Sequence, residues 1–132
     1  MTRTHEKVSD LPEGERPAYT AASAAQGIEQ AFKILDGRWK LLILFHLFGY
    51  KVLRFSDLER AIPAISQKML AQQLRQLEAD GIVRRTVHHQ VPPKVEYQLT
   101  TWGQSLCPAL DALLQWAESR EKTSVLTQEV SE

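Results

Sequence analysis

The spacing of apolar residues along the chain predicts five helices and, between the fourth and the fifth, two β-strands. The helices are expected over residues 24–35, 38–48, 57–62 and 67–80, and from about residue 101 onward. The strands are expected over residues 82–89 and 94–100. Ser23, Ser56 and Ser66 each stand just before one of these helices, where serine side chains favour N-caps.

The fourth predicted helix has two contrasting faces. Leu70, Leu74 and Leu77 recur at i, i+4 and i+7, which marks one face for burial. The other face is rich in amides and cations and poor in carboxylates, and it carries Gln67, Lys68, Gln72, Arg75 and Gln76. Amide and guanidinium groups hydrogen-bond to base edges and phosphates in a DNA major groove. Ser66 is both the expected cap and a candidate phosphate ligand.

A basic pair of strands follows this helix at once, with Pro92 and Pro93 in the turn. This order predicts a mainly α fold with a small antiparallel β-wing, a winged helix-turn-helix. His89 and Lys94 near the wing tip are candidates for minor-groove or phosphate contact. Arg84 and Arg85 point to opposite sides of their strand, so either can face DNA or pair with acidic residues behind it.

The other helices supply apolar surface. The helix over residues 38–48 is apolar nearly all round and is expected to be the central core helix. The first and last helices carry more apolar side chains than a small core must bury, which indicates a dimer formed through them. The candidate interface residues are Ile28, Phe32, Leu110, Leu113, Leu114 and Trp116.

Charge is balanced overall, with 16 Lys or Arg and 16 Asp or Glu in 132 residues. Residues 54–95 hold seven cations and four anions, a net charge of +3, whereas residues 118–132 have a net charge of −2. The asymmetry gives modest support to nucleic-acid binding by the middle of the chain. The expected organisation is a flexible arm (1–20), a DNA-binding and dimerisation domain (21–122) and a C-terminal tail (123–132).

Several classes of function lack their sequence signals. No apolar signal core or stretch of about 20 apolar residues is present, which predicts a cytoplasmic protein without a membrane partner. No phosphate-binding loop, nucleophile set or paired-carboxylate motif is evident, so no catalytic residue, metal or cofactor is expected. Cys107 is the single cysteine and is read as a small buried residue, with a regulatory thiol at the dimer interface as the alternative.

Several motifs in order and spacing carry a family resemblance over roughly residues 26–118. They are IEQAF (28–32), GRWKLLIL (37–44), RFSDL (54–58), ISQKML (65–70), LRQLEADGIV (74–83), VPPKVEYQLT (91–100) and GQSL (103–106). Together they resemble the HxlR-type family of bacterial transcriptional regulators. The resemblance implies a homodimeric winged-helix repressor or activator, with a recognition helix over residues 66–79 and a wing near residues 88–94.

One position departs from that family. Many members have a cysteine followed by proline before the Ile-Glu pair of the first helix, and some use this cysteine to sense oxidants or electrophiles. Gln26 and Gly27 stand there in this chain. The redox mechanism of that subgroup is therefore not carried over.

The expected function is sequence-specific regulation by a homodimer on a pseudo-palindromic operator in double-stranded DNA. Two recognition helices would enter successive major grooves about 34 Å apart. One alternative is a winged-helix module that contacts proteins only. Another is a sensor whose DNA binding is switched by an unknown small-molecule effector or by the Cys107 thiol.

Overall fold

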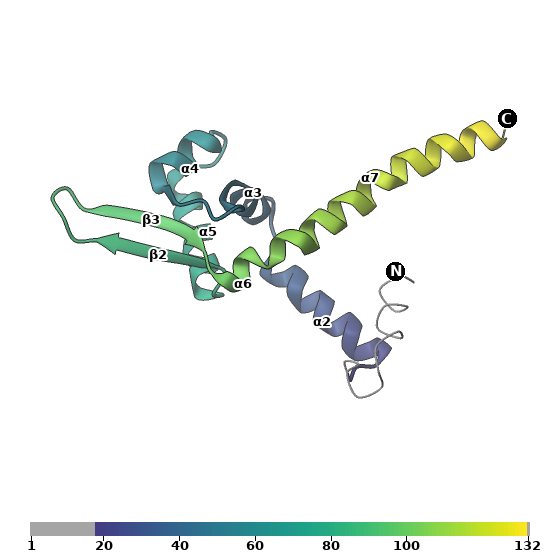
Figure 1. Ribbon diagram of the computed structural model, residues 1–132, viewed down its shortest axis with the longest axis horizontal. Helices are drawn as coiled ribbons and strands as arrows, with labels where there is room; N and C mark the ends of the chain where they lie inside the picture. The colour runs from purple at the N-terminus through teal and green to yellow at the C-terminus, as the bar shows by residue number, and fades with distance from the viewer. Residues whose placement is uncertain (1–17, 132) are drawn as a thin grey trace. The chain divides into compact units, whose positions relative to one another are not determined.

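The computed structural model describes the backbone of residues 18–131 and the side chains of residues 18–120. The chain divides into two units between Asp36 and Gly37. The described part of the first unit is helix α2 (Ala21–Ile34). The elements of the second unit are α3 (Arg38–Leu47), β1 (Leu53–Arg54), α4 (Phe55–Ala61), α5 (Gln67–Ala79), β2 (Val83–His88), β3 (Lys94–Leu99), α6 (Thr101–Gln104) and α7 (Leu106–Ser131) (Figure 1). The mainly α fold with a small antiparallel wing is confirmed.

Helix α2 begins three residues earlier than its sequence pattern suggested. Thr20, rather than Ser23, is the N-cap, because its hydroxyl accepts a hydrogen bond from the Ser23 amide at 3.1 Å. Ser23 in turn accepts one from the Thr20 amide at 2.8 Å, which completes a capping box. No residue of α2 is buried.

The core of the second unit lies where α3, α4 and α5 meet the sheet. Its fully buried side chains are Ile43, Leu44, Leu47, Leu58, Leu70, Leu74, Leu77 and Val83. Helix α3, the expected central core helix, supplies Ile43, Leu44 and Leu47 to this core, but its apolar residues Leu41, Leu42 and Phe45 are exposed. One side of α3 packs on α4, α5 and β3, and the described residues of this unit leave the opposite side uncovered.

Helices α4 and α5 form the helix-turn-helix, and their N-termini are capped differently. The expected Ser56 cap is wrong: α4 begins at Phe55, and Asp57 accepts a hydrogen bond from the Arg54 amide at 2.8 Å. A carboxylate in the first turn also stabilises the helix by its interaction with the positive end of the helix dipole. The Ser66 cap of α5 is confirmed, because its hydroxyl accepts from the Met69 amide at 3.1 Å.

The sheet is antiparallel, with strand order β1-β3-β2. Tyr97 lies between Leu53 of β1 and Arg85 of β2, and Glu96 lies between Arg54 of β1 and Thr86 of β2. Since directly opposed residues share a face, the register separates an apolar face from a polar one. The polar face consists of Arg54, Arg84, Thr86, His88, Lys94, Glu96 and Gln98. Beyond the helices, β2 and β3 extend as a hairpin closed by residues 89–93 (Figure 1).

A compact joint connects the base of the wing to α6. Thr100 caps α6 by accepting from the Gly103 amide at 3.0 Å, and its hydroxyl donates to the Gly81 carbonyl at 2.7 Å. The Thr100 amide donates to the Ile82 carbonyl at 2.9 Å. Gly103 is buried against that same carbonyl, with no room for a side chain. The base of the wing is therefore fixed to the start of the C-terminal helices.

Helix α7 continues to Ser131, through residues for which the sequence indicates a tail. Residues 1–17, most of the expected arm, lie outside the described residues. The division into arm, domain and tail stays a prediction.

Candidate nucleic-acid interface

The exposed side of α5 is built as the sequence predicts. Lys68, Gln72 and Arg75 recur at i, i+4 and i+7 and are all exposed. Leu70, Leu74 and Leu77, on the opposite side of the same helix, are at most 1% exposed. Since burial of the leucines fixes the rotation of the helix, Lys68, Gln72 and Arg75 form one stripe directed away from the core. We call these three residues the α5 stripe.

Among the described side chains, the charges of the α5 stripe have no ion-pair partner. Within residues 18–120, no ion pair includes Lys68 or Arg75. A guanidinium without an intramolecular carboxylate keeps its donor fork available for a guanine edge or a phosphate. Gln67 and Ser66 are exposed at the N-terminal end of α5, next to the stripe. This is the end of a recognition helix that usually reaches base edges.

The wing carries its basic residues close to the hairpin loop. His89 is exposed in that loop, and Lys94 opens β3 directly opposite His88. Lys94 is not free: its Nζ lies 3.6 Å from Glu96 Oε1. The same carboxylate oxygen lies 2.5 Å from His88 Nε2. Lys94 therefore reaches the surface as part of a group of three polar side chains that share the Glu96 carboxylate.

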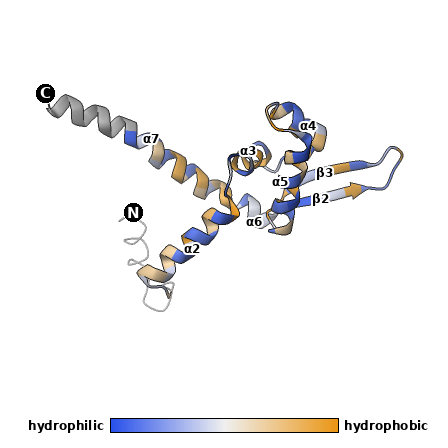
Figure 2. Cartoon of the chain, turned by 180° about the vertical axis from the view of Figure 1, so that it is seen from behind, coloured by the Kyte–Doolittle hydropathy of each residue, from blue (hydrophilic) through white to orange (hydrophobic). Residues whose placement is uncertain are grey.

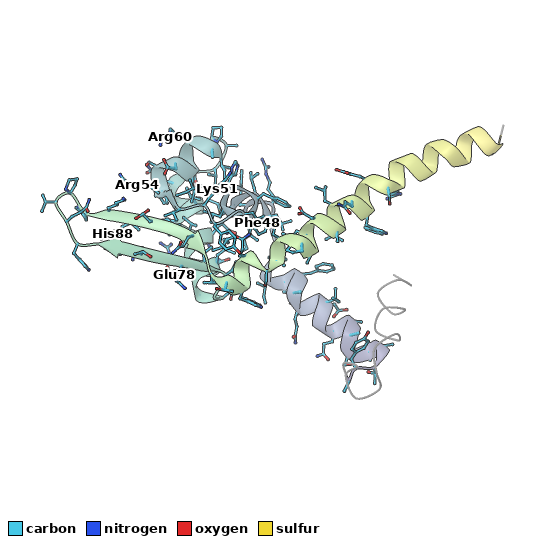
Figure 3. The ribbon with its side chains drawn as sticks, viewed as in Figure 1. Phe48, Lys51, Arg54, Arg60, Glu78 and His88 are labelled. Carbon is cyan, nitrogen blue, oxygen red and sulfur yellow. The ribbon has the colours of Figure 1, made fainter. Side chains whose placement is uncertain are left out.

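The sheet also positions basic residues that were left open or missed by sequence reasoning. Arg84 and Arg85 are exposed, and neither forms an ion pair with any described acidic side chain, so the proposed pairing with acids behind the wing is absent from this part of the chain. Arg54, which is labelled in Figure 3, lies on the polar face of the sheet, where the strand register places it directly opposite Glu96. The alternation of residues 94–98 indicated one face of β3, but only the pairing of β1 with β3 brings Arg54 to it.

The candidate dimer residues differ in exposure. Ile28 and Phe32 on α2 are 56% and 57% exposed, and Trp116 on α7 is 67% exposed. Leu113 and Leu114 are also exposed, and Figure 2 shows apolar positions along this part of α7. Leu110, in contrast, is buried within its own unit, so it has little surface left for a partner. The residues of the predicted interface other than Leu110 therefore present apolar surface.

Cys107 lies in the first turn of α7 and is half-buried. Its Sγ is 3.8 Å from Asp111 Oδ2. Partial burial of the thiol, followed by the nearby negative charge of Asp111 and the hydrogen bond to it, raises the pKa of Cys107 above its usual value. Redox-sensing cysteines generally have a lowered pKa and an electropositive environment. The environment of Cys107 is of the opposite kind.

This environment predicts slow alkylation of Cys107. Because the thiolate is the reacting species, iodoacetamide should react with Cys107 more slowly at neutral pH than with free N-acetylcysteine. The rate should reach half its maximum at a higher pH than for the free thiol. Asp111→Asn should lower that midpoint and speed the reaction, whereas Glu118→Gln should change neither. A rate equal to or above that of N-acetylcysteine would show that the thiol is activated.

An open depression of about 480 Å³ lies beside this cysteine, between the turn after α3 and the start of α7. Its lining includes Tyr50, Gln104, Cys107 and Asp111. Binding of a small-molecule effector stays a prediction. In the described part of the chain, no group of three or more His, Cys, Asp or Glu side chains is arranged to hold a metal ion. None of the described helices has the length and apolar character needed to cross a membrane.

Known proteins share both the sequence and the fold. The sequence model for the HxlR-like helix-turn-helix matches residues 34–124. YtcD of Bacillus subtilis (strain 168), an HTH-type transcriptional regulator without an assigned role, is 52% identical over 89 residues, which cover 67% of this chain and 70% of YtcD. This match includes most of the region that contains α5 and the wing.

Two solved structures are similar to the chain. The redox regulator HypR in its reduced form is 43% identical, with a TM-score of 0.66, and covers 74% of this chain and 95% of its own. The reduced form of the transcriptional regulator YodB from B. subtilis is 40% identical, with a TM-score of 0.65, and covers 70% of this chain and 89% of its own. The chain therefore belongs to the HxlR-like helix-turn-helix family and is a winged helix-turn-helix transcriptional regulator.

Proposed function

We propose that the protein acts as a homodimer that binds a pseudo-palindromic operator and reads it with the α5 stripe. The observation that carries this proposal is the stripe itself, in which Lys68, Gln72 and Arg75 are exposed and their charges are unpaired within the described residues. Gln can pair with adenine and Arg with guanine in the major groove. Lys68 supplies a cation for the phosphate backbone.

Dimerisation is supported by the surfaces of α2 and α7. Helix α2 has 14 residues and buries none of them. Helices of about this length are marginally stable in water without packing, so α2 requires a partner surface for its exposed Ile28 and Phe32. A second copy of the chain supplies apolar residues of the same kind, and two copies give the two-fold symmetry that a palindromic site requires. Light scattering on the purified protein should give the mass of two chains.

A thiol switch is not part of the proposed function. HypR is named as a redox regulator, but the chain has Gln26 and Gly27 at the position of the cysteine-proline pair of many relatives. Its one cysteine has a raised pKa. Operator binding should therefore be the same before and after treatment with a thiol oxidant.

DNA binding is tested by incubating the purified protein with sheared genomic DNA, recovering the bound fragments and sequencing them. We expect enrichment of fragments that share a short inverted repeat. Affinity for these fragments should fall linearly with salt on logarithmic axes, because bound phosphates release counterions. Recovery of no common sequence, together with salt-independent association, would favour a module that contacts proteins only.

Ser66 combines a structural and a binding role, and two variants separate them. Ser66→Ala should lower the free energy of unfolding by about 1 kcal/mol, because the Met69 amide loses its acceptor. Ser66→Asp retains a capping oxygen but places a negative charge beside the DNA phosphates. Its stability in urea unfolding should stay near that of the wild type, while operator affinity falls. Wild-type operator affinity in Ser66→Asp would place the start of α5 away from the DNA backbone.

A further inference from the structure

A single carboxylate lies among the basic side chains of the wing. Glu96 Oε1 is 2.5 Å from His88 Nε2 and 3.6 Å from Lys94 Nζ. The side chains of Glu96 and Lys94 are partly buried, with 21% and 33% exposed, whereas His88 is exposed, at 44%. Partial burial reduces solvent screening of these interactions. Glu96 therefore holds two basic residues on one face of the hairpin, next to its loop.

The register of the sheet places two arginines on the same face as Glu96, in addition to the two side chains that contact it. Arg54 of β1 is directly opposite Glu96, and Arg84 of β2 is its diagonal neighbour on the same polar face. Neither arginine forms an ion pair among the side chains of residues 18–120. Glu96 is thus the one acidic residue of a sheet face that also holds Arg54, Arg84, His88 and Lys94. A carboxylate on a surface that binds DNA weakens the electrostatic attraction for the phosphates. Glu96 must therefore contribute to DNA binding in another way.

We infer that Glu96 is a positioning residue that restrains Lys94 and His88 on the wing and thereby favours the operator over other DNA. This inference rests on the proposed DNA-binding function. An unrestrained lysine side chain can reach a phosphate in many positions of the protein on DNA. A lysine held by Glu96 reaches a phosphate only when the wing is placed as it is on the operator. The carboxylate reduces non-specific attraction more than specific binding, because specific binding also has the contacts of the α5 stripe.

The test compares Glu96→Gln with the wild type on two labelled duplexes, one carrying the recovered inverted repeat and one of random sequence. Fluorescence anisotropy is measured over a series of KCl concentrations. With Lys94 released, each protomer should gain about one phosphate contact with the random duplex, which steepens the logarithmic salt slope by about 0.9 per protomer. Between about 200 and about 50 mM KCl, the affinity gain of the variant for the random duplex should grow about threefold per released lysine, because one phosphate contact changes affinity by about that factor over this range of salt. The ratio of operator affinity to random-duplex affinity should fall.

A second background separates positioning from a simple change in net charge. In Lys94→Ala, adding Glu96→Gln should leave the salt slope unchanged, because the lysine that it releases is absent. Glu118→Gln, on α7, removes the same charge away from the wing and should behave as the wild type. Equal steepening with and without Lys94, or no steepening in either background, would overturn the inference.

Two controls distinguish a change in stability, and a failure of the proposed function, from a failure of the role of Glu96. Thermal unfolding followed by circular dichroism should give the same midpoint for Glu96→Gln and the wild type, since Gln keeps the shape of Glu. If the wild type binds neither duplex, the proposed function fails. If the wild type binds the operator and Glu96→Gln leaves slope and affinity ratio unaltered, only the role of Glu96 fails.

Discussion

Gly103→Ala should destabilise the second unit by about 3 kcal/mol in urea unfolding, at the upper end of the usual cost of overpacking. A Cβ at this position would overlap the Ile82 carbonyl oxygen and come within 3.1 Å of Ile82 Cγ2. The carbonyl cannot move away freely, because it accepts a hydrogen bond from the Thr100 amide at 2.9 Å. Relief of the overlap must therefore separate α6 from the base of the wing or break that hydrogen bond.

Gly27→Ala is the matched control for this substitution. Gly27 lies inside α2, and no atom lies within 4 Å of a Cβ built there. Alanine in an open helical position is more favourable than glycine by about 0.8–1 kcal/mol, so this variant should have helical content equal to or above that of the wild type. A wild-type unfolding midpoint for Gly103→Ala would contradict the tight joint between the wing and α6.

Among the substitutions considered, Arg75→Ala should cause the largest loss of operator affinity. Replacement of a side chain that makes a bidentate contact with a base costs about 1–3 kcal/mol, and a symmetric dimer loses this contact in both half-sites. We therefore expect a decrease in operator affinity of about 2–6 kcal/mol, twice the cost of a single contact. Stability should be unaffected, because Arg75 is exposed and has no ion-pair partner among the described side chains.

Two substitutions put this result in context. Lys68→Ala should weaken binding to the operator and to random DNA alike, with a salt slope shallower by about 2, as expected for the loss of one phosphate contact in each half-site. Arg120→Ala removes a positive charge from α7 and should leave operator affinity near that of the wild type. Operator affinity unchanged in Arg75→Ala, with the mass of the dimer retained, would show that the α5 stripe does not read the site.

Local patterns were sufficient to predict much of this fold. The leucine spacing of α5 predicted its buried and exposed sides, and Ser66 was correctly predicted as its cap. Two other predicted caps were wrong for a local reason. Thr20 caps α2 through reciprocal hydrogen bonds with Ser23, whereas at the start of α4 the Asp57 carboxylate accepts a hydrogen bond from the Arg54 amide. A serine before an apolar run does not distinguish the N-cap from a residue inside the first turn.

Long-range pairing limited what the sequence could predict of the site. The neighbours of Glu96 come from β1 and β2, and the register that opposes it to Arg54 depends on contacts between segments 42 residues apart in sequence. The apolar pattern of α3 also gave no sign that Leu41, Leu42 and Phe45 would stay exposed. A sequence of apolar residues does not show whether the covering surface belongs to the same chain or to a partner.

The most direct test of base reading by α5 is to repeat the selection of bound genomic fragments with Arg75→Ala and Gln72→Ala. If the stripe contacts bases, each variant should lose discrimination at one base-pair position in each half-site, at symmetric places, while the remaining positions of the repeat are retained. A selected sequence identical to that of the wild type in both variants would contradict the account, because it would place these side chains away from the DNA.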